Sequence, residues 1–246
     1  GLGRNPKVGI EYSELIKPAD VLYHIEAMTN LFINEGNYED RNKARIRYIL
    51  ERLGKDKFIE IYKEHLKNSF DNNNLDLSVE YKEITKEVKK IDIKHPRLYE
   101  QKQEGLYSVY FHPVGGQIFV KTLREILNKL EVVKDLEIRL TMTEGLYFRN
   151  LNGDEAKELI DMTQDLGGET ALQQSVSCIG VPICQVRILE SQKTLNNVLD
   201  YFKEKGYKKD ILPRIHISGC GNSCAVHEVV GIGFTGKRKK VGDTVQ

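Results

Sequence analysis

The sequence lacks long apolar runs and a strong charge of either sign. Its longest apolar stretches fall short of the roughly 20 residues needed to cross a bilayer, and charges interrupt them within a turn or two. Lysine and arginine (37) balance aspartate and glutamate (36), so the formal net charge is +1. No global field would hold a polyanion on such a surface. The sequence therefore predicts neither a membrane protein nor a nucleic-acid-binding protein.

A secretion signal is also missing. The chain begins Gly1-Leu2-Gly3-Arg4, without an initiator methionine and without a charged segment followed by an apolar one. We therefore expect a piece of a longer polypeptide. The abundance of lysine and glutamate without secretion features indicates a cytoplasmic protein, in which disulfides are disfavoured.

The first part of the chain is predicted to be helical. Apolar residues recur at three- and four-residue steps over residues 18–36, 39–53 and 56–69, as in helices that bury one face. Residues 71–104 are polar and charged, which predicts a connector with one short strand where Ile91 and Ile93 alternate with charged residues. Residues 1–104 thus form a helical segment and connector.

The middle of the chain has the order of a ferredoxin-like half unit. A strand is predicted over 106–112, a helix over 117–130, strands over 136–141 and 145–148, and a helix over 154–166. In the last part, helical spacing runs from Cys184 towards Gly206, and strands are expected over 214–218 and 229–234. We predict an α+β fold with three parts: residues 1–104, a ferredoxin-like half domain at 105–168, and an α/β unit at 169–246.

All four cysteines lie in the last part, and none occurs in the first 177 positions. They form a Cys-x5-Cys pair, Cys178 and Cys184, and a Cys-x3-Cys pair, Cys220 and Cys224. Two close pairs on two loops can converge on one centre. Two disulfides would need an oxidising compartment. Four buried structural thiols fit poorly, because Cys178 and Cys220 lie in turns that contain glycine.

A metal centre remains, either one zinc ion or an iron-sulfur cluster. Zinc pairs usually have two to four intervening residues, so the five-residue gap argues against zinc. A cuboidal cluster spreads its thiolates over a wider volume and tolerates wider loops. We expect Cys184 to open a helix, whose N–H groups would favour a thiolate. Gly219 and Gly221 would let backbone N–H groups approach the sulfur atoms.

Three motifs carry a family resemblance. Residues 177–184 (SCIGVPIC), 218–225 (SGCGNSCA) and 231–236 (GIGFTG) resemble the sulfite and nitrite reductase family, which carries sirohaem and a four-iron four-sulfur cluster. Residues 37–54, 113–116 and 139–141 extend the resemblance over most of the chain.

The resemblance implies a site and an activity. The cluster ligands would be Cys178, Cys184, Cys220 and Cys224, and Cys224 would also bridge the cluster to the sirohaem iron. With Cys224, Asn222 is our candidate for cofactor binding, and residues 169–246 would be the iron-sulfur and sirohaem domain. The parent enzyme would be an oxidoreductase that takes electrons from a carrier such as ferredoxin. It would reduce a small oxyanion in six-electron chemistry, either sulfite to sulfide or nitrite to ammonia.

The chain also departs from the family. Gly221 stands where the family usually has proline. The chain resembles the tail of the first of two similar halves and nearly all of the second, so we expect this piece alone to be inactive. Two alternatives stay open: a non-catalytic, zinc-stabilised module, and an electron-carrier iron-sulfur protein without sirohaem.

Other candidates have ordinary explanations beside functional ones. Gly115-Gly116 is a candidate anion cradle or a plain turn. His227 is a candidate for a sirohaem face or a loop histidine. Residues 237–240 (KRKK) are a candidate docking patch for an acidic carrier or a solvated turn. Arg139 and Arg149 would face an anionic tetrapyrrole or water.

Overall fold

The computed structural model describes residues 1–12, 14–78, 80, 82–186, 188–207, 211–241 and 244–245. Contacts divide the chain into two compact units. The first comprises Gly1 with Asn5–Glu83, and the second Leu2–Arg4 with Ile84–Gln246. The mixture of helices and sheets confirms the predicted α+β class.

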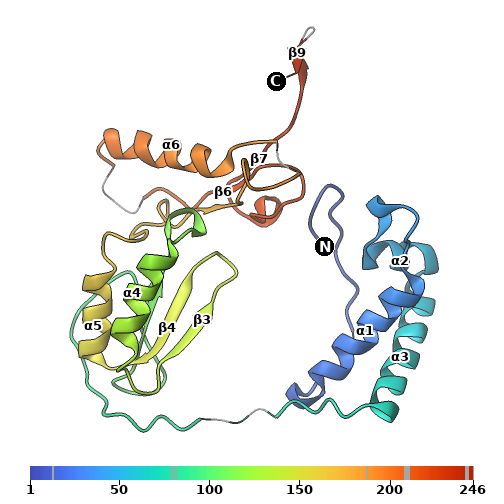
Figure 1. The fold of residues 1–246 in the computed structure, drawn as a ribbon, viewed down its shortest axis with the longest axis horizontal. Coiled ribbons are helices and arrows are strands. Elements are labelled where there is room, and N and C mark those ends of the chain that lie inside the picture. Colours follow the sequence, from blue (N-terminus) through green and yellow to red (C-terminus); the bar gives the residue numbers. More distant parts are fainter. Residues whose placement is uncertain are drawn as a thin grey trace. The chain divides into compact units, whose positions relative to one another are not determined.

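The first unit is helical (Figure 1). Its helices are α1 (Val21–Glu35), α2 (Ile46–Leu53) and α3 (Lys55–Asn72), with a 3-10 turn at Pro18–Asp20 before α1. Helices α1 and α3 pack side by side. The buried core of this unit comprises Ala27, Leu31, Ile49, Phe58 and Tyr62. The apolar pattern also predicts Val21, Leu22, Ile25 and Ile46 on the inner faces, but these four side chains are exposed.

The helix predicted over 39–53 is broken. A 3-10 turn, Arg41–Lys43, is followed by a non-helical Ala44, and α2 begins only at Ile46. The Asp40 carboxylate accepts a hydrogen bond from the Asn42 N–H at 3.0 Å. Short polar side chains of this kind offer the backbone an alternative to the helix, which local periodicity does not reveal.

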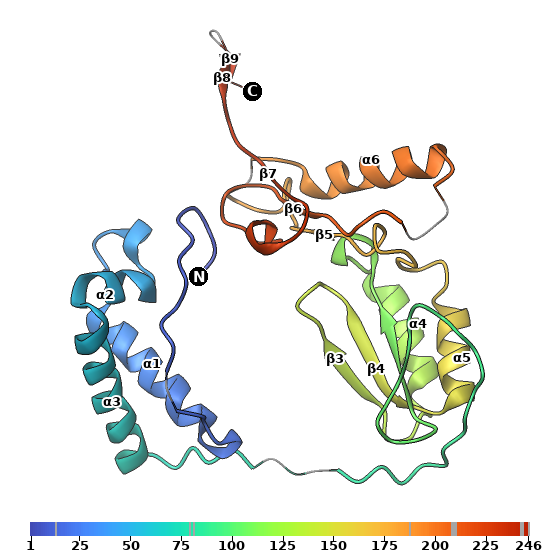
Figure 2. The same cartoon turned by 180° about the vertical axis from the view of Figure 1, so that it is seen from behind.

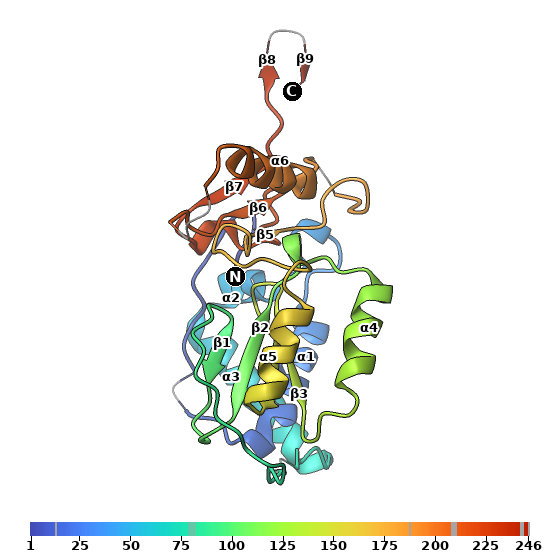
Figure 3. The same ribbon diagram turned by 90° about the vertical axis from the view of Figure 1, so that its left-hand side faces the viewer.

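The second unit contains a four-stranded antiparallel sheet of order β1-β2-β4-β3. Its strands are β1 (Leu98–Glu100), β2 (Tyr107–Phe111), β3 (Glu137–Leu140) and β4 (Leu146–Leu151). Helices α4 (Val120–Leu130) and α5 (Gly153–Met162) share one apolar core with this sheet (Figure 3). The predicted order of strand, helix, two strands and helix is confirmed, although α5 ends four residues earlier than expected.

Residues 84–104 belong to this unit by their contacts rather than to the helical segment. No strand forms at Ile91 and Ile93; both side chains pack against the sheet core. The Ile91 N–H donates to the Tyr107 hydroxyl at 3.0 Å, so a side chain takes the place of a partner strand. The strand of this segment is β1 instead, a few residues farther on.

A second sheet is parallel, with order β5-β6-β7 (Figure 2). It consists of β5 (Val176–Ser177), β6 (His216–Ser218) and β7 (Gly233–Thr235), and α6 (Ser191–Glu204) packs with it. Beyond it, β8 (Lys240–Val241) and β9 (Thr244–Val245) form a hairpin. The strand predicted over 229–234 is shorter, because a 3-10 turn occupies His227–Val229.

The predicted helix start at Cys184 is wrong, since α6 begins only at Ser191. The Val181 N–H donates to the Leu189 carbonyl at 3.3 Å, and the Leu189 N–H donates to the Gly219 carbonyl at 3.1 Å. Through these two hydrogen bonds, Leu189 joins the loop of the first cysteine pair to the loop that carries Cys220. The expected stabilisation of the Cys184 thiolate by a helix N-terminus is therefore wrong as well.

Candidate functional site

The four cysteines lie on loops at one edge of the parallel sheet. Cys178 follows β5 directly, and Cys220 comes two residues after β6. Carboxyl ends of neighbouring parallel strands meet at the same sheet edge. The Cys178 N–H donates to the Ile217 carbonyl at 3.0 Å, which continues the pairing of the two strands into the loops. Sheet pairing therefore brings the two cysteine pairs together.

The Cys178 sulfur is surrounded by polar groups. It accepts a hydrogen bond from the Gly219 N–H at 3.0 Å and lies 3.2 Å from the Ser191 hydroxyl oxygen. A Cβ on Gly219 would lie 3.4 Å from this sulfur and 3.0 Å from the Leu189 carbonyl oxygen. Glycine therefore allows the close approach of backbone to sulfur that the sequence predicts at position 219.

All four cysteines are free thiols, so the structure pairs none of them in a disulfide. The pKa of Cys224 is raised above its ordinary value, chiefly by partial desolvation and then by repulsion from Cys178, Cys220 and Cys184. This desolvation is incomplete, because the Cys224 side chain is exposed. Cys224 thus lies within electrostatic reach of the other three thiols.

The thiols do not surround one ion tightly. Among the described residues, no group of three or more histidine, cysteine, aspartate or glutamate side chains is placed to hold a single metal ion. A cubic cluster separates its ligands more widely than one zinc ion does. The described thiols are therefore not arranged as a tetrahedral single-zinc site.

The loop that carries Cys220 and Cys224 is held against β6. The buried Ser218 hydroxyl accepts from the Ala225 N–H at 3.2 Å and lies 2.8 Å from Nδ1 of His227. Ser223 (φ 58°) and Val226 (φ 59°) adopt left-handed conformations, which are strained for residues other than glycine. The contact with Ser218 gives His227 a structural role in the loop. Asn222, between the two cysteines of this loop, is exposed.

The Gly115-Gly116 turn connects the cysteine loops to the ferredoxin-like part. Gln192 Nε2 donates to the carbonyl oxygens of Gly115 and Ser177, at 2.8 Å each. A Cβ on Gly115 would lie 2.2 Å from Gln192 Oε1, and one on Gly116 would lie 2.6 Å from Glu144 Oε2. Side chains fill the space beside both glycines. This favours the plain turn over the anion cradle.

Two titratable side chains near this turn have strongly shifted pKa values. Burial raises the pKa of Glu144 to about 7, partly opposed by the hydrogen bond that Glu144 accepts from the Ser177 N–H at 3.3 Å. Burial lowers the pKa of His112 to about 4, and its Nε2 lies 2.8 Å from the Thr143 carbonyl oxygen. Sequence reasoning missed Glu144, Ser191 and Gln192, because no motif or spacing marks them.

The remaining candidates are paired with a carboxylate or are exposed. Arg139 and Arg149 both contact the Glu137 carboxylate, each at 2.6 Å. Of the basic stretch 237–240, the first three side chains are exposed, and the side chain of Lys240 lies outside the described residues.

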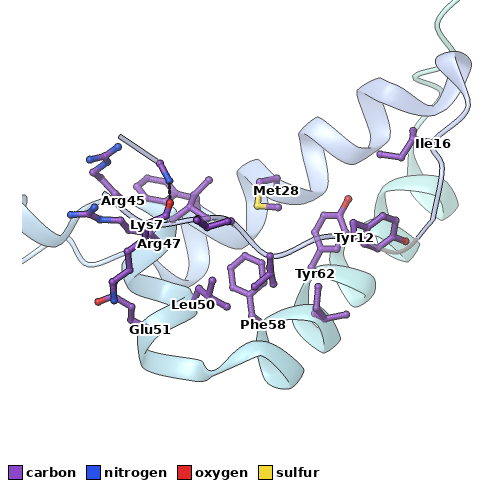
Figure 4. A pocket seen from close by; sticks show the side chains of 17 residues that line it. Lys7, Tyr12, Ile16, Met28, Arg45, Arg47, Leu50, Glu51, Phe58 and Tyr62 are labelled. Carbon is purple, nitrogen blue, oxygen red and sulfur yellow. Dashed lines mark hydrogen bonds and ion pairs between the residues drawn. The ribbon is translucent and has the colours of Figure 1, made fainter. Parts of the chain in front are cut away.

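A cavity of about 680 Å³ lies in the first unit (Figure 4). Its wall is mainly apolar and includes Met28, Leu50 and Phe58, while the ion pair between Lys7 and Glu51 lies at one end. No cysteine is among its lining residues. None of the described helices is long and apolar enough to cross a bilayer.

Comparisons with known proteins agree with this architecture. The model of the "Nitrite and sulphite reductase 4Fe-4S domain" matches residues 1–70, and that of the "Nitrite/Sulfite reductase ferredoxin-like half domain" matches residues 99–166. The four cysteines lie outside both matched ranges. Their assignment therefore rests on the loops described above and not on these matches.

Relatives and one solved structure cover most of the chain. Sulfite reductase [ferredoxin] 1 of Mycolicibacterium paratuberculosis is 25% identical, over 99% of this chain and 43% of the relative. The sulfite reductase [NADPH] hemoprotein beta-component of Bacillus subtilis is 29% identical, over 82% and 35%. The chloroplastic ferredoxin–nitrite reductase of Oryza sativa is 24% identical, over 88% and 36%. The Mycobacterium tuberculosis NirA protein has a similar fold, with a TM-score of 0.71 at 22% identity, over 99% of this chain and 44% of that one.

The chain thus spans less than half the length of these relatives. The two family models together match more than half of the 246 residues, and both describe nitrite and sulfite reductases. The relatives are sulfite and nitrite reductases as well, which are oxidoreductases. The chain belongs to the nitrite and sulfite reductase family, which implies a four-iron four-sulfur cluster and sirohaem as its cofactors.

Proposed function

We propose that this chain is the cluster-holding part of a sulfite or nitrite reductase, with Cys178, Cys184, Cys220 and Cys224 as the four cluster ligands. One observation carries the proposal: two loops that leave paired parallel strands at one sheet edge carry four free thiols, and Cys224 lies within electrostatic reach of the other three. The glycine at 219, whose N–H already donates to Cys178, supports it further.

The chain's own residues hold the two cysteine loops in position and orient the proposed ligands. Pairing of β5 with β6 places the loops, and the Ser218 contacts hold the loop of Cys220 and Cys224. Cys224, the most exposed of the thiols, is the ligand proposed to bridge to the sirohaem iron, with Asn222 beside it. When bound, the cluster would relay electrons from an external donor, and sirohaem would provide the reaction centre for six-electron reduction of sulfite or nitrite.

The partners are an electron donor and a small oxyanion. The printed names of the relatives include ferredoxin and NADPH, so we propose ferredoxin, or a protein that relays electrons from NADPH, as the donor. Because the chain covers less than half of these relatives, we propose that it does not turn over substrate by itself. The cytoplasmic location expected from the sequence stays a prediction.

Anaerobic reconstitution with ferrous iron and sulfide tests the ligand assignment. We expect about four irons per chain together with acid-labile sulfide. One zinc per chain and no iron would support the zinc-stabilised module instead. Cys184→Ser should lose iron, whereas Ile183→Ser should retain it, because Ile183 is a neighbour in the same loop whose side chain is 69% exposed.

The bridging role needs a separate experiment on the full-length parent. We expect Cys224→Ser to abolish coupling between cluster and sirohaem even where some cluster survives. Absorbance bands of bound sirohaem in the unaltered parent would exclude a simple electron carrier. Unchanged turnover in the Cys224→Ser parent would remove the bridging assignment.

A further inference from the structure

A buried serine lies against one of the proposed ligands. Ser191 is the first residue of α6 and is fully buried. Its hydroxyl donates to the Cys178 carbonyl oxygen at 2.7 Å and its oxygen lies 3.2 Å from the Cys178 sulfur. No other side-chain hydroxyl is recorded against that sulfur within the described part of the chain.

The surrounding backbone keeps this hydroxyl in place. Gly180 has a φ of +55°, and a Cβ there would lie 2.3 Å from the Ser191 oxygen. The position that faces the hydroxyl is therefore the one at which the chain carries no side chain. Glycine at 180 both tolerates the left-handed backbone and leaves room for Ser191.

The protons can be followed through ligation. The Ser191 hydroxyl has one proton. While the Cys178 thiol is neutral, Ser191 donates this proton to the Cys178 carbonyl, and the Cys178 S–H can donate to the Ser191 oxygen. A metal-bound thiolate has lost its proton to solvent and only accepts. The hydroxyl can then rotate to donate to the sulfur. After this rotation the Cys178 carbonyl keeps a longer contact with Gln192 Nε2 at 3.3 Å, which shares the two amide protons that also go to the Gly115 and Ser177 carbonyls.

We infer that Ser191 is a positioning residue that donates a hydrogen bond to the Cys178 thiolate and raises the reduction potential of the cluster. The inference rests on the proposed function, since it requires Cys178 to be a ligand. In the couple concerned, the cluster accepts one electron from an external one-electron reductant, and no bond forms or breaks. Reduction adds negative charge that the thiolate sulfurs share, so a donor on sulfur stabilises the reduced state more than the oxidised state.

The test is a redox titration of the reconstituted protein, with dithionite as reductant. Ser191→Ala should leave the iron content unchanged and shift the midpoint potential to more negative values. We expect about a tenfold smaller ratio of reduced to oxidised cluster at equal poise, which is about 59 mV for one electron. Ser191→Thr keeps the hydroxyl and should restore the potential. Ser191→Gly removes it with still less bulk and should repeat the alanine shift.

Ser175→Ala is the matched control. Ser175 is equally buried, but its hydroxyl contacts the Leu172 carbonyl and the Ile215 N–H rather than a sulfur. The midpoint potential of the cluster in the Ser175→Ala variant should equal that in the wild type. An assembled four-iron cluster whose potential is the same with serine, alanine and glycine at 191 overturns this inference alone. A wild-type chain that assembles no such cluster overturns the proposed function and this inference with it.

Discussion

Glu144 and His112 lie near the same turn, and burial shifts both towards their neutral forms. The pKa of Glu144 is raised from 4.5 to about 7, and that of His112 is lowered from 6.5 to about 4. In each case loss of water around the charged form is the largest cause. Two side chains outside any motif thus make the stability of this unit depend on pH.

Glu144→Gln isolates the carboxyl contribution. The folded pKa of Glu144 lies above the unfolded value, so its stabilisation is present below pH 4.5 and is lost as the pH rises through 7. Glutamine has no titratable proton, so the stability of the Glu144→Gln variant does not change with the charge state of residue 144. Relative to wild type, the variant should gain about 1–2 kcal/mol between acid and alkaline pH, because the Glu144 carboxyl is only partly buried and solvent screens part of the effect.

Urea unfolding of wild type and variant at pH 5 and pH 8 measures this difference. His112 destabilises the fold as the pH falls below 6.5, because its folded pKa is depressed, but it does so in both proteins and cancels in the comparison. A stability difference that is the same at both pH values would show that Glu144 is not buried as described.

Gly180→Ala tests the tight approach in the loop of the first cysteine pair. An added Cβ would lie 2.3 Å from the Ser191 oxygen and 2.8 Å from the Leu189 carbonyl oxygen, at a positive φ. The backbone carbonyl cannot easily give way, so we expect a loss of about 2–4 kcal/mol. In Gly206→Ala the φ is also positive (+74°) but nothing lies within 4 Å, so the loss should be about 1–2 kcal/mol. Equal losses in urea unfolding would contradict the crowding.

At the scale of elements, Arg97 connects the segment before β1 to the end of α5. Its guanidinium is 1% exposed. It donates to the Thr163 hydroxyl at 2.8 Å, to the Ile160 carbonyl at 2.9 Å and to the Glu169 carboxylate at 3.0 Å. One side chain thus satisfies groups at the end of a helix and neutralises a carboxylate. These contacts add to those of Ile91, Ile93 and β1 that hold residues 84–104 on the second unit.

Arg97→Met should destabilise this unit by about 3–5 kcal/mol, because it removes the buried donors to the Glu169 carboxylate, the Thr163 hydroxyl and the Ile160 carbonyl. Arg97→Lys should also lose stability, since an ammonium group cannot reproduce a planar fork that reaches three acceptors. Thermal unfolding measures both. The control Arg139→Lys, at an arginine side chain that is 60% exposed, should change stability by no more than about 1 kcal/mol. A similarly small effect at Arg97 would argue that the guanidinium is hydrated.

At the scale of the whole molecule, all four cysteines belong to the second of the two units. A ligand that binds only the folded state stabilises the part that holds it. Loading with iron and sulfide should therefore slow amide hydrogen exchange in β5, β6, β7 and their loops. It should leave α1 and α3 unchanged. Exchange followed by mass spectrometry before and after reconstitution measures this, and an equal gain in α1 and α3 would place ligands outside the second unit.

The amino-acid sequence determined the elements whose pattern is local. Three- and four-residue periodicity identified α1 and α3, and the strand and helix order identified the ferredoxin-like part. The spacing of Cys178, Cys184, Cys220 and Cys224 marked the candidate site before any contact was known. Periodicity works here because each helix or strand buries one face along a continuous stretch of chain.

Only the tertiary structure decided what surrounds the sulfurs. Cys184 lies in a turn rather than a helix because Leu189 bonds to Gly219, thirty positions away, across the sheet edge. Ser191, Gln192 and Glu144 reach the cysteine loops through the pairing of β5 with β6 and the turn at Gly115. Such contacts depend on which segments meet in space, and the local pattern of apolar and polar residues does not contain that information.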